Sequence, residues 1–429
     1  MAGRPGPPQS EAPSPPSPLA RGGGLVAPLR PYGAVLALPG VRSLVLVTVL
    51  ARIPAAATAV VLTLHVVLSL GGGFGAAGLL AAALTAGGAL GQPLMGRATD
   101  RRGLRVTLAV TGCGSGAFWL LAPALPYPLL LPAAFAGGML ALPLFSVSRQ
   151  SLAALVPDER RRTAYSLDSM GVEVSYALGP AVGVLVATQV STRAALVAIG
   201  ASMLVSGLLL FLLDPPIRSE AELQAAESPA PVARRAWLSR RLVLVFVASA
   251  GATVVLSGTD VSIVATLRRA GELSWTGLVL AAWCCWSLLG GFVHGSVRRS
   301  LPAMALMGLL CVLTIPVGLA GHWWTLALAL VPAGALCAPT LAATGEVVSR
   351  LVPSGVRGEA MGVHGSSLTA GIALGAPLAG AVVDHSTPAM GFVAAGGAGA
   401  LLALAGLAAI RVSSLRIARY AVQPERSDS

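Results

Sequence analysis

The chain has 429 residues, of which 55% are hydrophobic and 11% charged, and its mean hydropathy is +0.79. A chain of this length has room for two or three water-soluble domains, but this composition excludes them and is typical of a polytopic membrane protein. The net charge of +12 comes from 29 arginines without a lysine, and they lie in short segments between apolar runs. This excludes a continuous nucleic-acid-binding face and a lysine-containing nucleotide-binding loop.

Twelve apolar runs are long enough to cross a bilayer, for which about 20 residues are needed. They follow an amino-terminal tail, residues 1–41, that is rich in proline and glycine. We expect this tail to be disordered because it cannot bury enough apolar surface, and it lacks the pattern of a cleaved signal peptide. The predicted spans are 44–68, 75–95, 104–124, 128–148, 164–187, 194–213, 242–267, 275–294, 301–320, 323–346, 360–382 and 388–410.

The arginines indicate which side of the membrane is cytoplasmic. An even number of spans places both termini on one face, and 25 of the 29 arginines fall on that face, against three on the other and Arg52 within a span. By the positive-inside rule both termini are cytoplasmic. We therefore expect a multi-pass protein of a bacterial cytoplasmic membrane.

The chain is built from two similar halves. The segment that begins at Val156-Pro157 returns at Val352-Pro353, and the offset of 196 residues persists through the loop and the helix that follow. The longest polar connection lies between the halves, and its proline start, acidic middle and basic end are typical of a linker. The predicted organisation is a tail (1–41), a six-helix bundle (42–213), a cytoplasmic linker (214–241), a second six-helix bundle (242–411) and a cytoplasmic carboxyl-terminal tail (412–429).

A charged segment of ten residues, from Gly96 to Arg105, separates the second and third runs. Its spacing is Gly-x-x-x-Asp-Arg-x-Gly-x-Arg, in which the glycines allow two helix ends to turn tightly and the aspartate can cap a helix. The residues that carry the pattern are Gly96, Asp100, Arg101, Gly103 and Arg105. An ordinary positive-inside loop would explain the arginines but not this spacing.

This pattern resembles the loop motif of the major facilitator superfamily of transporters, and the resemblance covers about residues 41–411. It implies an all-α membrane protein with twelve transmembrane helices in two pseudo-symmetric six-helix bundles, which rock around a central site. It also implies that Asp100 contacts the start of the eleventh span, near Arg357-Gly358-Glu359, and latches an outward-open gate. The motif departs from the family at Leu104, where a basic residue is usual. Its second copy, after Gly295, lacks the aspartate, which argues against a symmetric latch.

Charged residues inside the spans cost about 3 to more than 10 kcal/mol each, so each of them needs a reason. At 1.5 Å per residue, Arg52 lies roughly 12 Å and Glu173 roughly 13–14 Å into helices that the resemblance places side by side. A buried ion pair would keep both groups in the membrane. We expect Glu173 to be the proton-coupling carboxylate of the central cavity and Arg52 its counter-ion. A purely structural pair is the alternative.

Three other polar residues of the spans are secondary candidates. Asp168 is more readily a partner of the loop arginines than a substrate ligand, and Asp260 could serve an outer gate. His364 could titrate in the pathway, although a satisfied core histidine is the simpler interpretation. The five histidines and five cysteines show no metal-ligand spacing, so we expect neither a metal nor a cofactor.

The fifth span contains Gly179, Pro180 and Gly183, which resemble the Gly-Pro-x-x-Gly core of a motif seen in drug–proton antiporters. Proline bends a helix there and the glycines allow close packing, and the motif favours export. Trp283 and Trp286 share one helical face, where they form either an aromatic wall for a substrate or a packing contact.

The sequence therefore predicts a secondary transporter, not an enzyme, that exchanges an apolar drug or metabolite for protons in efflux. A proton symporter or facilitator that imports a metabolite is the first alternative, and a non-transporting membrane sensor or enzyme is the second. The expected partners are a small molecule, protons and the lipid bilayer, without nucleic acid, and we expect a monomer.

Overall fold

The computed structural model describes residues 29–225, 234–297 and 300–421, and every regular element within these ranges is helical. Disorder was predicted for the tail of residues 1–41; residues 1–28 lie outside the described residues, but for Arg30–Leu36 the prediction is wrong, because these residues form a helix that packs on α7 and α12. The first half contains α1 (Arg30–Leu36), α2 (Val41–Leu64), η2 (His65–Ser69), α3 (Phe74–Arg102), α4 (Leu104–Leu121), η3 (Ala122–Ala124), α5 (Tyr127–Met139), α6 (Leu144–Leu155), η4 (Asp158–Arg160), α7 (Arg161–Gln189) and α8 (Thr192–Leu213). The connection contains α9 (Glu220–Ala225) and α10 (Arg234–Trp237). The second half contains α11 (Arg240–Ala270), η5 (Leu273–Trp275), α12 (Thr276–Ser296), α13 (Ala303–Thr314), η6 (Ile315–Leu319), α14 (Trp323–Leu351), η7 (Ser354–Val356), α15 (Arg357–His385) and α16 (Pro388–Ala421).

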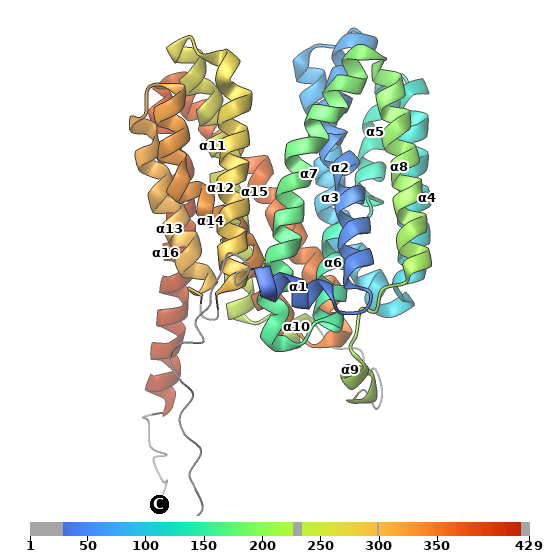
Figure 1. The fold of residues 1–429 in the computed structure, drawn as a ribbon, viewed down its shortest axis with the longest axis vertical. Helices are drawn as coiled ribbons and strands as arrows, with labels where there is room; N and C mark the ends of the chain where they lie inside the picture. Colours follow the sequence, from blue (N-terminus) through green and yellow to red (C-terminus); the bar gives the residue numbers. More distant parts are fainter. Residues whose placement is uncertain (1–28, 226–233, 298–299, 422–429) are drawn as a thin grey trace, which may run out of the picture.

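The long helices form two bundles that stand side by side (Figure 1). In the first bundle α2 packs on α7, α3 on α5 and α4 on α8, and in the second α11 packs on α15, α12 on α14 and α13 on α16. The same pairing in the same order is the pseudo-twofold relation predicted from the repeat. Each bundle also buries its own large apolar core. The predicted fold class is confirmed, whereas the residue limits of the five predicted segments stay predictions.

Eleven helical segments within the described residues are long and apolar enough to span a membrane, and the ninth predicted span is shorter. It consists of 12 α-helical residues in α13 followed by five 3₁₀ residues in η6. A 3₁₀ helix rises about 2.0 Å per residue against 1.5 Å for an α-helix, so the two together reach about 28 Å. That is close to the hydrocarbon thickness of about 30 Å, which is consistent with twelve spans.

The charged segment from Gly96 to Arg105 is helical rather than a loop. α3 continues to Arg102 and α4 begins at Leu104, so the two helices meet at Gly103. The φ angle of Gly103 is +88°, in the left-handed region that glycine adopts without a steric penalty. The sequence alone suggested a helix end at the first charge, but a helix can continue past the hydrocarbon into water.

The repeat seen in the sequence produces the same local structure in both halves. Pro157 precedes the 3₁₀ turn η4 and then α7, and Pro353 precedes the 3₁₀ turn η7 and then α15. α7 begins at Arg161 and α15 at Arg357, which keeps the offset of 196 residues.

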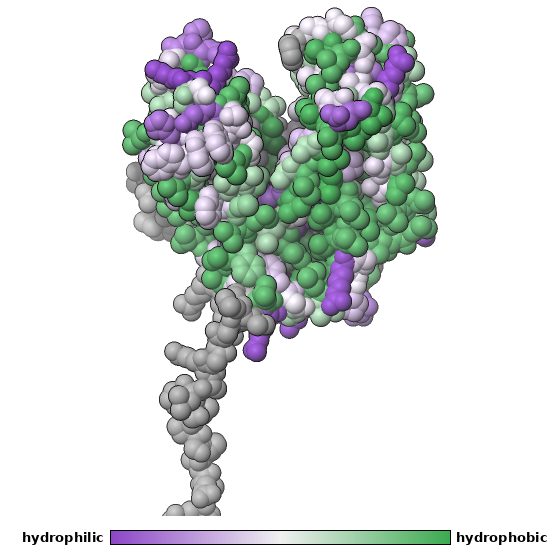
Figure 2. Space-filling model, turned by 45° about the horizontal axis from the view of Figure 1, so that its top comes forward, coloured by the Kyte–Doolittle hydropathy of each residue, from purple (hydrophilic) through white to green (hydrophobic). Residues whose placement is uncertain are grey.

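The two bundles touch at one end of the molecule and diverge at the other (Figure 1). We call the end that carries α1, α9 and α10 the closed end, and the opposite end the open end. Across the seam between the bundles, α3 packs on α15 and α7 on α12. Figure 2 shows a cleft between the bundles at the open end, and apolar residues cover much of the outer surface, as expected for contact with lipid.

Candidate functional site

The basic group inside the first bundle is bound by Asp168, so the predicted pair of Arg52 and Glu173 is wrong. Arg52 Nη1 lies 2.8 Å from Asp168 Oδ1, and both side chains are buried. The sequence estimate compared depth along the helices but not rotation around them. Asp168 and Glu173 are five residues apart on α7 and therefore point about 140° apart around its axis. Only Asp168 faces α2.

Asp168 also binds Arg149 of α6, which lies one residue beyond the predicted fourth span, 128–148. Arg149 Nε lies 3.2 Å from Asp168 Oδ2, and its fully buried guanidinium stacks over Phe145 at 4.0 Å. Ser148 donates a hydrogen bond to the same carboxylate. The sequence signal that could have placed Arg149 inside a helix is Val156-Pro157. A helix that ends at this pair has Arg149 two turns before its carboxyl end. One carboxylate thus pairs with two buried guanidinium groups.

Glu173 faces the other way, across the seam between the bundles. Its carboxylate is buried and accepts a hydrogen bond of 2.9 Å from Ser287 of α12, whose hydroxyl accepts one of 3.1 Å from the backbone N–H of Ala338 in α14. No arginine pairs with Glu173 within the described ranges. Asp260 of α11 interacts with it electrostatically and is itself exposed, so two carboxylates from opposite bundles approach the same region.

The contact expected for Asp100 is present at the closed end. Its two carboxylate oxygens accept hydrogen bonds from the backbone N–H groups of Gly358 (2.9 Å) and Glu359 (2.8 Å), the first residues of α15. An aspartate at a helix N-terminus satisfies unpaired N–H groups and favours the helix dipole. Gly96 permits this approach, because a Cβ there would lie 2.1 Å from the carbonyl oxygen of Gly358. The other two motif residues lie nearby: Arg101 is exposed, and Arg105 stacks on Phe211 at 4.8 Å and pairs with Asp214 at 3.5 Å.

The equivalent seam between α7 and α12 is closed by different chemistry. Thr163 donates to the carbonyl oxygen of Gly295 at 2.6 Å, and Tyr32 of α1 donates to the carbonyl oxygens of Gly291 and Phe292 at 3.1 and 2.8 Å. A Cβ on Gly295 would lie 2.3 Å from the Tyr32 hydroxyl. An aromatic residue from the amino-terminal helix therefore contributes to this second seam, whose motif copy lacks the aspartate.

The comparison with known proteins gives the family. A sequence profile of the Major Facilitator Superfamily matches residues 44–297, more than half of the chain. The chain belongs to this superfamily. Its members are transporters, so the closed end, the cleft and the polar groups at the seam are parts of a transport protein. No curated protein sequence matches the chain.

Solved structures of facilitator-superfamily transporters share the fold at low sequence identity. The human organic anion transporter MFSD10 (TETRAN) is 16% identical with a TM-score of 0.60, over 88% of this chain and 99% of that one. The proton:xylose symporter XylE is 15% identical with a TM-score of 0.63, over 85% and 94%. A bacterial homologue of the iron transporter ferroportin, in its outward-facing state, is 15% identical with a TM-score of 0.66, over 86% and 99%.

In this facilitator-superfamily chain the remaining candidates lie in packing contacts. Gly179 and Gly183 let α7 approach α2, since Cβ atoms there would lie 2.4 Å from the carbonyl oxygen of Ile53 and 2.8 Å from Ala57. Pro180 lies between them, inside α7. His364 is fully buried and bonds Thr344 at 3.3 Å. Both tryptophans pack toward α14, where a Cβ on its Gly334 would meet Trp283 and Trp286 at 3.5 and 2.9 Å.

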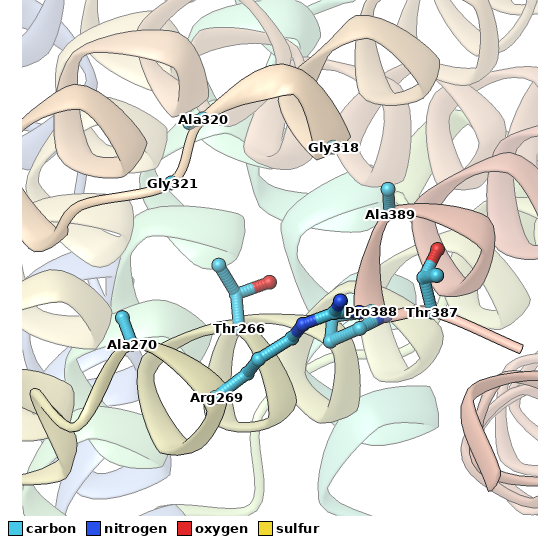
Figure 3. A pocket seen from close by; sticks show the side chains of 9 residues that line it. All are labelled: Thr266, Arg269, Ala270, Gly318, Ala320, Gly321, Thr387, Pro388 and Ala389. Atoms are coloured by element: carbon cyan, nitrogen blue, oxygen red, sulfur yellow. The ribbon is translucent and has the colours of Figure 1, made fainter.

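Two surface pockets lie away from the buried acids. One of about 260 Å³ is at the open end of the second bundle, where Arg269 reaches across toward Thr387 and Pro388 at the start of α16 (Figure 3). The other, of about 590 Å³, is at the closed end and is lined by charged residues that include Arg161, Glu222 and Arg357. Neither contains a residue of the predicted central site.

Proposed function

We propose that the chain is a proton-coupled exporter of a small, apolar drug or metabolite in a bacterial cytoplasmic membrane, working as a monomer by alternating access. Glu173 is the proton-coupling carboxylate. Arg52 belongs to the same central region, but it is held by Asp168 and is not the counter-ion of Glu173. The arginine asymmetry makes the closed end cytoplasmic, so the molecule is outward-open.

The position of Glu173 is the observation that carries this proposal. A carboxylate within a span is costly and is usually functional. Asp168 has two arginine partners that explain its presence structurally, whereas Glu173 has a single neutral donor from the opposite bundle. A group held in this way can gain and lose a proton as the bundles move, because no fixed positive charge keeps it ionised.

Export is favoured over import by the Gly179-Pro180-x-x-Gly183 core, which brings α7 into close contact with α2. Import with protons is the second candidate, because a structurally similar chain is described as a proton:xylose symporter. The direction of proton-driven movement separates these two candidates.

The test uses the full chain in inside-out membrane vesicles from a host that lacks its own exporters. A panel of neutral and cationic fluorescent dyes serves as probe. A pH gradient with an acidic vesicle interior drives accumulation of the dye inside the vesicles. We expect Glu173→Gln to abolish gradient-driven accumulation and to retain exchange of preloaded dye without a gradient. Glu159→Gln, an exposed acid on η4, is the matched control and stays at wild-type level. Full coupling in Glu173→Gln contradicts the assignment, and accumulation driven only by the opposite gradient indicates import.

A further inference from the structure

Ser287 lies on α12, the helix of the second bundle that packs on α7 across the seam, and its hydroxyl contacts Glu173. It is fully buried, and its hydroxyl oxygen accepts the N–H of Ala338 at 3.1 Å while lying 2.9 Å from Glu173 Oε1. A serine hydroxyl has one hydrogen, and the N–H of Ala338 supplies the other hydrogen at this oxygen. The hydrogen of Ser287 is therefore directed at the carboxylate of Glu173.

This hydrogen bond is the single one that reaches Glu173 in the described part of the chain. Arg52 of α2 is turned away and bound to Asp168. The other titratable groups within electrostatic range of Glu173 carry no positive charge; they are Tyr176 on α7, Asp260 on α11, Cys284 on α12 and Cys337 on α14. The ionised form of Glu173 is thus stabilised by Ser287 rather than by a cation.

The donor and the acceptor belong to different bundles. Glu173 is on α7 of the first bundle, whereas Ser287 and Ala338 are on α12 and α14 of the second. The N–H of Ala338 holds the hydroxyl in place relative to the second bundle, so the hydrogen bond exists only while α7 and α12 remain close. A rocking motion that separates these helices removes the donor from Glu173.

We propose that Ser287 is the positioning residue of the coupling carboxylate, which holds ionised Glu173 across the seam while the closed end is shut. When α7 and α12 part at this level, the carboxylate loses its donor, so its affinity for a proton depends on the relative position of the bundles. This inference rests on the proposed role of Glu173 as the coupling group. The role of Ser287 links the protonation state of Glu173 to the relative position of the two bundles.

The test follows the protonated carboxyl of Glu173 by its carbonyl stretch in infrared difference spectra of the purified full-length protein during a pH titration. Glu173→Gln identifies the band by removing it. Ser287→Ala removes a hydrogen bond that is stronger to the ionised carboxylate than to the protonated carboxyl, so we expect the protonated form to persist to a pH about one to two units higher, a tenfold to hundredfold change in proton concentration. Ser287→Thr keeps the hydroxyl and restores the wild-type midpoint.

Ser249→Ala is the control for loss of a buried hydroxyl. Ser249 is fully buried on α11 and donates to the carbonyl oxygen of Val245 in its own helix, so its removal leaves the midpoint unchanged. Equal midpoints in Ser287→Ala and wild type would overturn the role of Ser287 even if Glu173→Gln abolishes coupling. If no band disappears in Glu173→Gln, it is the role of Glu173, and thus the proposed function, that fails.

Discussion

Asp168 is the residue on which the interior of the first bundle depends most directly. It bonds Arg52 and Arg149, both of them buried, at 2.8 and 3.2 Å. Removing one partner of a buried ion pair is costly because it leaves an uncompensated charge in a region of low dielectric. Here a single loss would leave two guanidinium groups without a counter-ion.

We therefore expect Asp168→Asn to destabilise the protein by about 3–5 kcal/mol. Thermal unfolding of the purified protein in detergent measures the change. Asp158→Asn is the comparison: its pair with Arg161 lies at the surface and contributes less than about 1 kcal/mol. Similar unfolding midpoints for the two variants would show that the ion pairs of Asp168 with Arg52 and Arg149 do not stabilise the fold more than a surface pair does.

At the scale of residues, the sequence could not predict which carboxylate pairs with Arg52. It predicted Glu173, and the structure has Asp168 instead. Composition placed Arg52, Asp168 and Glu173 within predicted spans, and each of them lies in a helix long and apolar enough to cross a membrane. Which carboxylate faces α2 depends on the rotation of α7, and the sequence contains no direct signal for rotation in a helix with polar residues on several faces. Ser287 could not be selected either, since one serine among many becomes informative only when its partners are known.

Among the elements, the short helix α1 has a role that its length does not suggest. It lies before the first span, yet Tyr32 is buried, stacks on Phe292 at a ring distance of 5.1 Å and bonds two carbonyl oxygens of α12. α1 also packs on α7, so it touches both helices of one seam. The sequence analysis assigned this segment to the disordered tail, because seven residues before a span carry no periodicity to read.

Replacing Tyr32 by Phe should cost about 1 kcal/mol, since the ring stays stacked and the hydrogen bonds are lost. Burial raises the pKa of Tyr32 from 10.0 to about 12, so folding favours its neutral hydroxyl. The contribution is therefore full below pH 10 and is lost as the pH rises toward 12. Unfolding of wild type and Tyr32→Phe, compared across pH 8 to 12, should show a difference that shrinks above pH 10. A constant difference over that range contradicts a buried donor.

The elements themselves were largely predictable from the sequence. Eleven of the predicted spans correspond to helices that are long and apolar enough to cross a membrane, because hydrocarbon leaves a chain few other ways to pair its backbone. The ends were less accurate where helices continue into water, as α3 does as far as Arg102. The contact of Asp100 with the start of α15 was expected from family resemblance alone, since no local pattern connects residues 258 positions apart.

At the scale of the whole molecule, the open cleft is maintained by contacts at the closed end. Asp100 caps α15 on one seam, and Tyr32 and Thr163 fasten the other. The linker adds to this, because Glu222 pairs with Arg357 and Arg234 pairs with Glu359 in the first turn of α15. Loosening any of these contacts should shift the population toward molecules whose closed end has opened.

Gly96→Ala tests whether the contact between α3 and α15 keeps the closed end shut. The added Cβ would lie 2.1 Å from the carbonyl oxygen of Gly358 and must push α3 away from α15. In a variant whose sole cysteine is Cys284, on the seam helix α12, we expect Gly96→Ala to slow labelling by a bulky water-soluble thiol reagent severalfold, because the open-end cleft is less populated. Gly78→Ala, on the same helix with nothing within 4 Å of its Cβ, should label as the parent does. Equal rates in both variants would show that the α3–α15 contact does not control the cleft.

The short ninth span has a consequence for the choice of membrane. α13 and η6 together reach about 28 Å, and the 3₁₀ turns have already stretched this segment relative to an α-helix. Its neighbours can match a thicker bilayer by changing their tilt, but this span has no spare length, so lipids beside it must thin locally. The second bundle is therefore better suited to lipids with short acyl chains. In a thicker bilayer the cost of hydrophobic mismatch falls on the second bundle and not on the first.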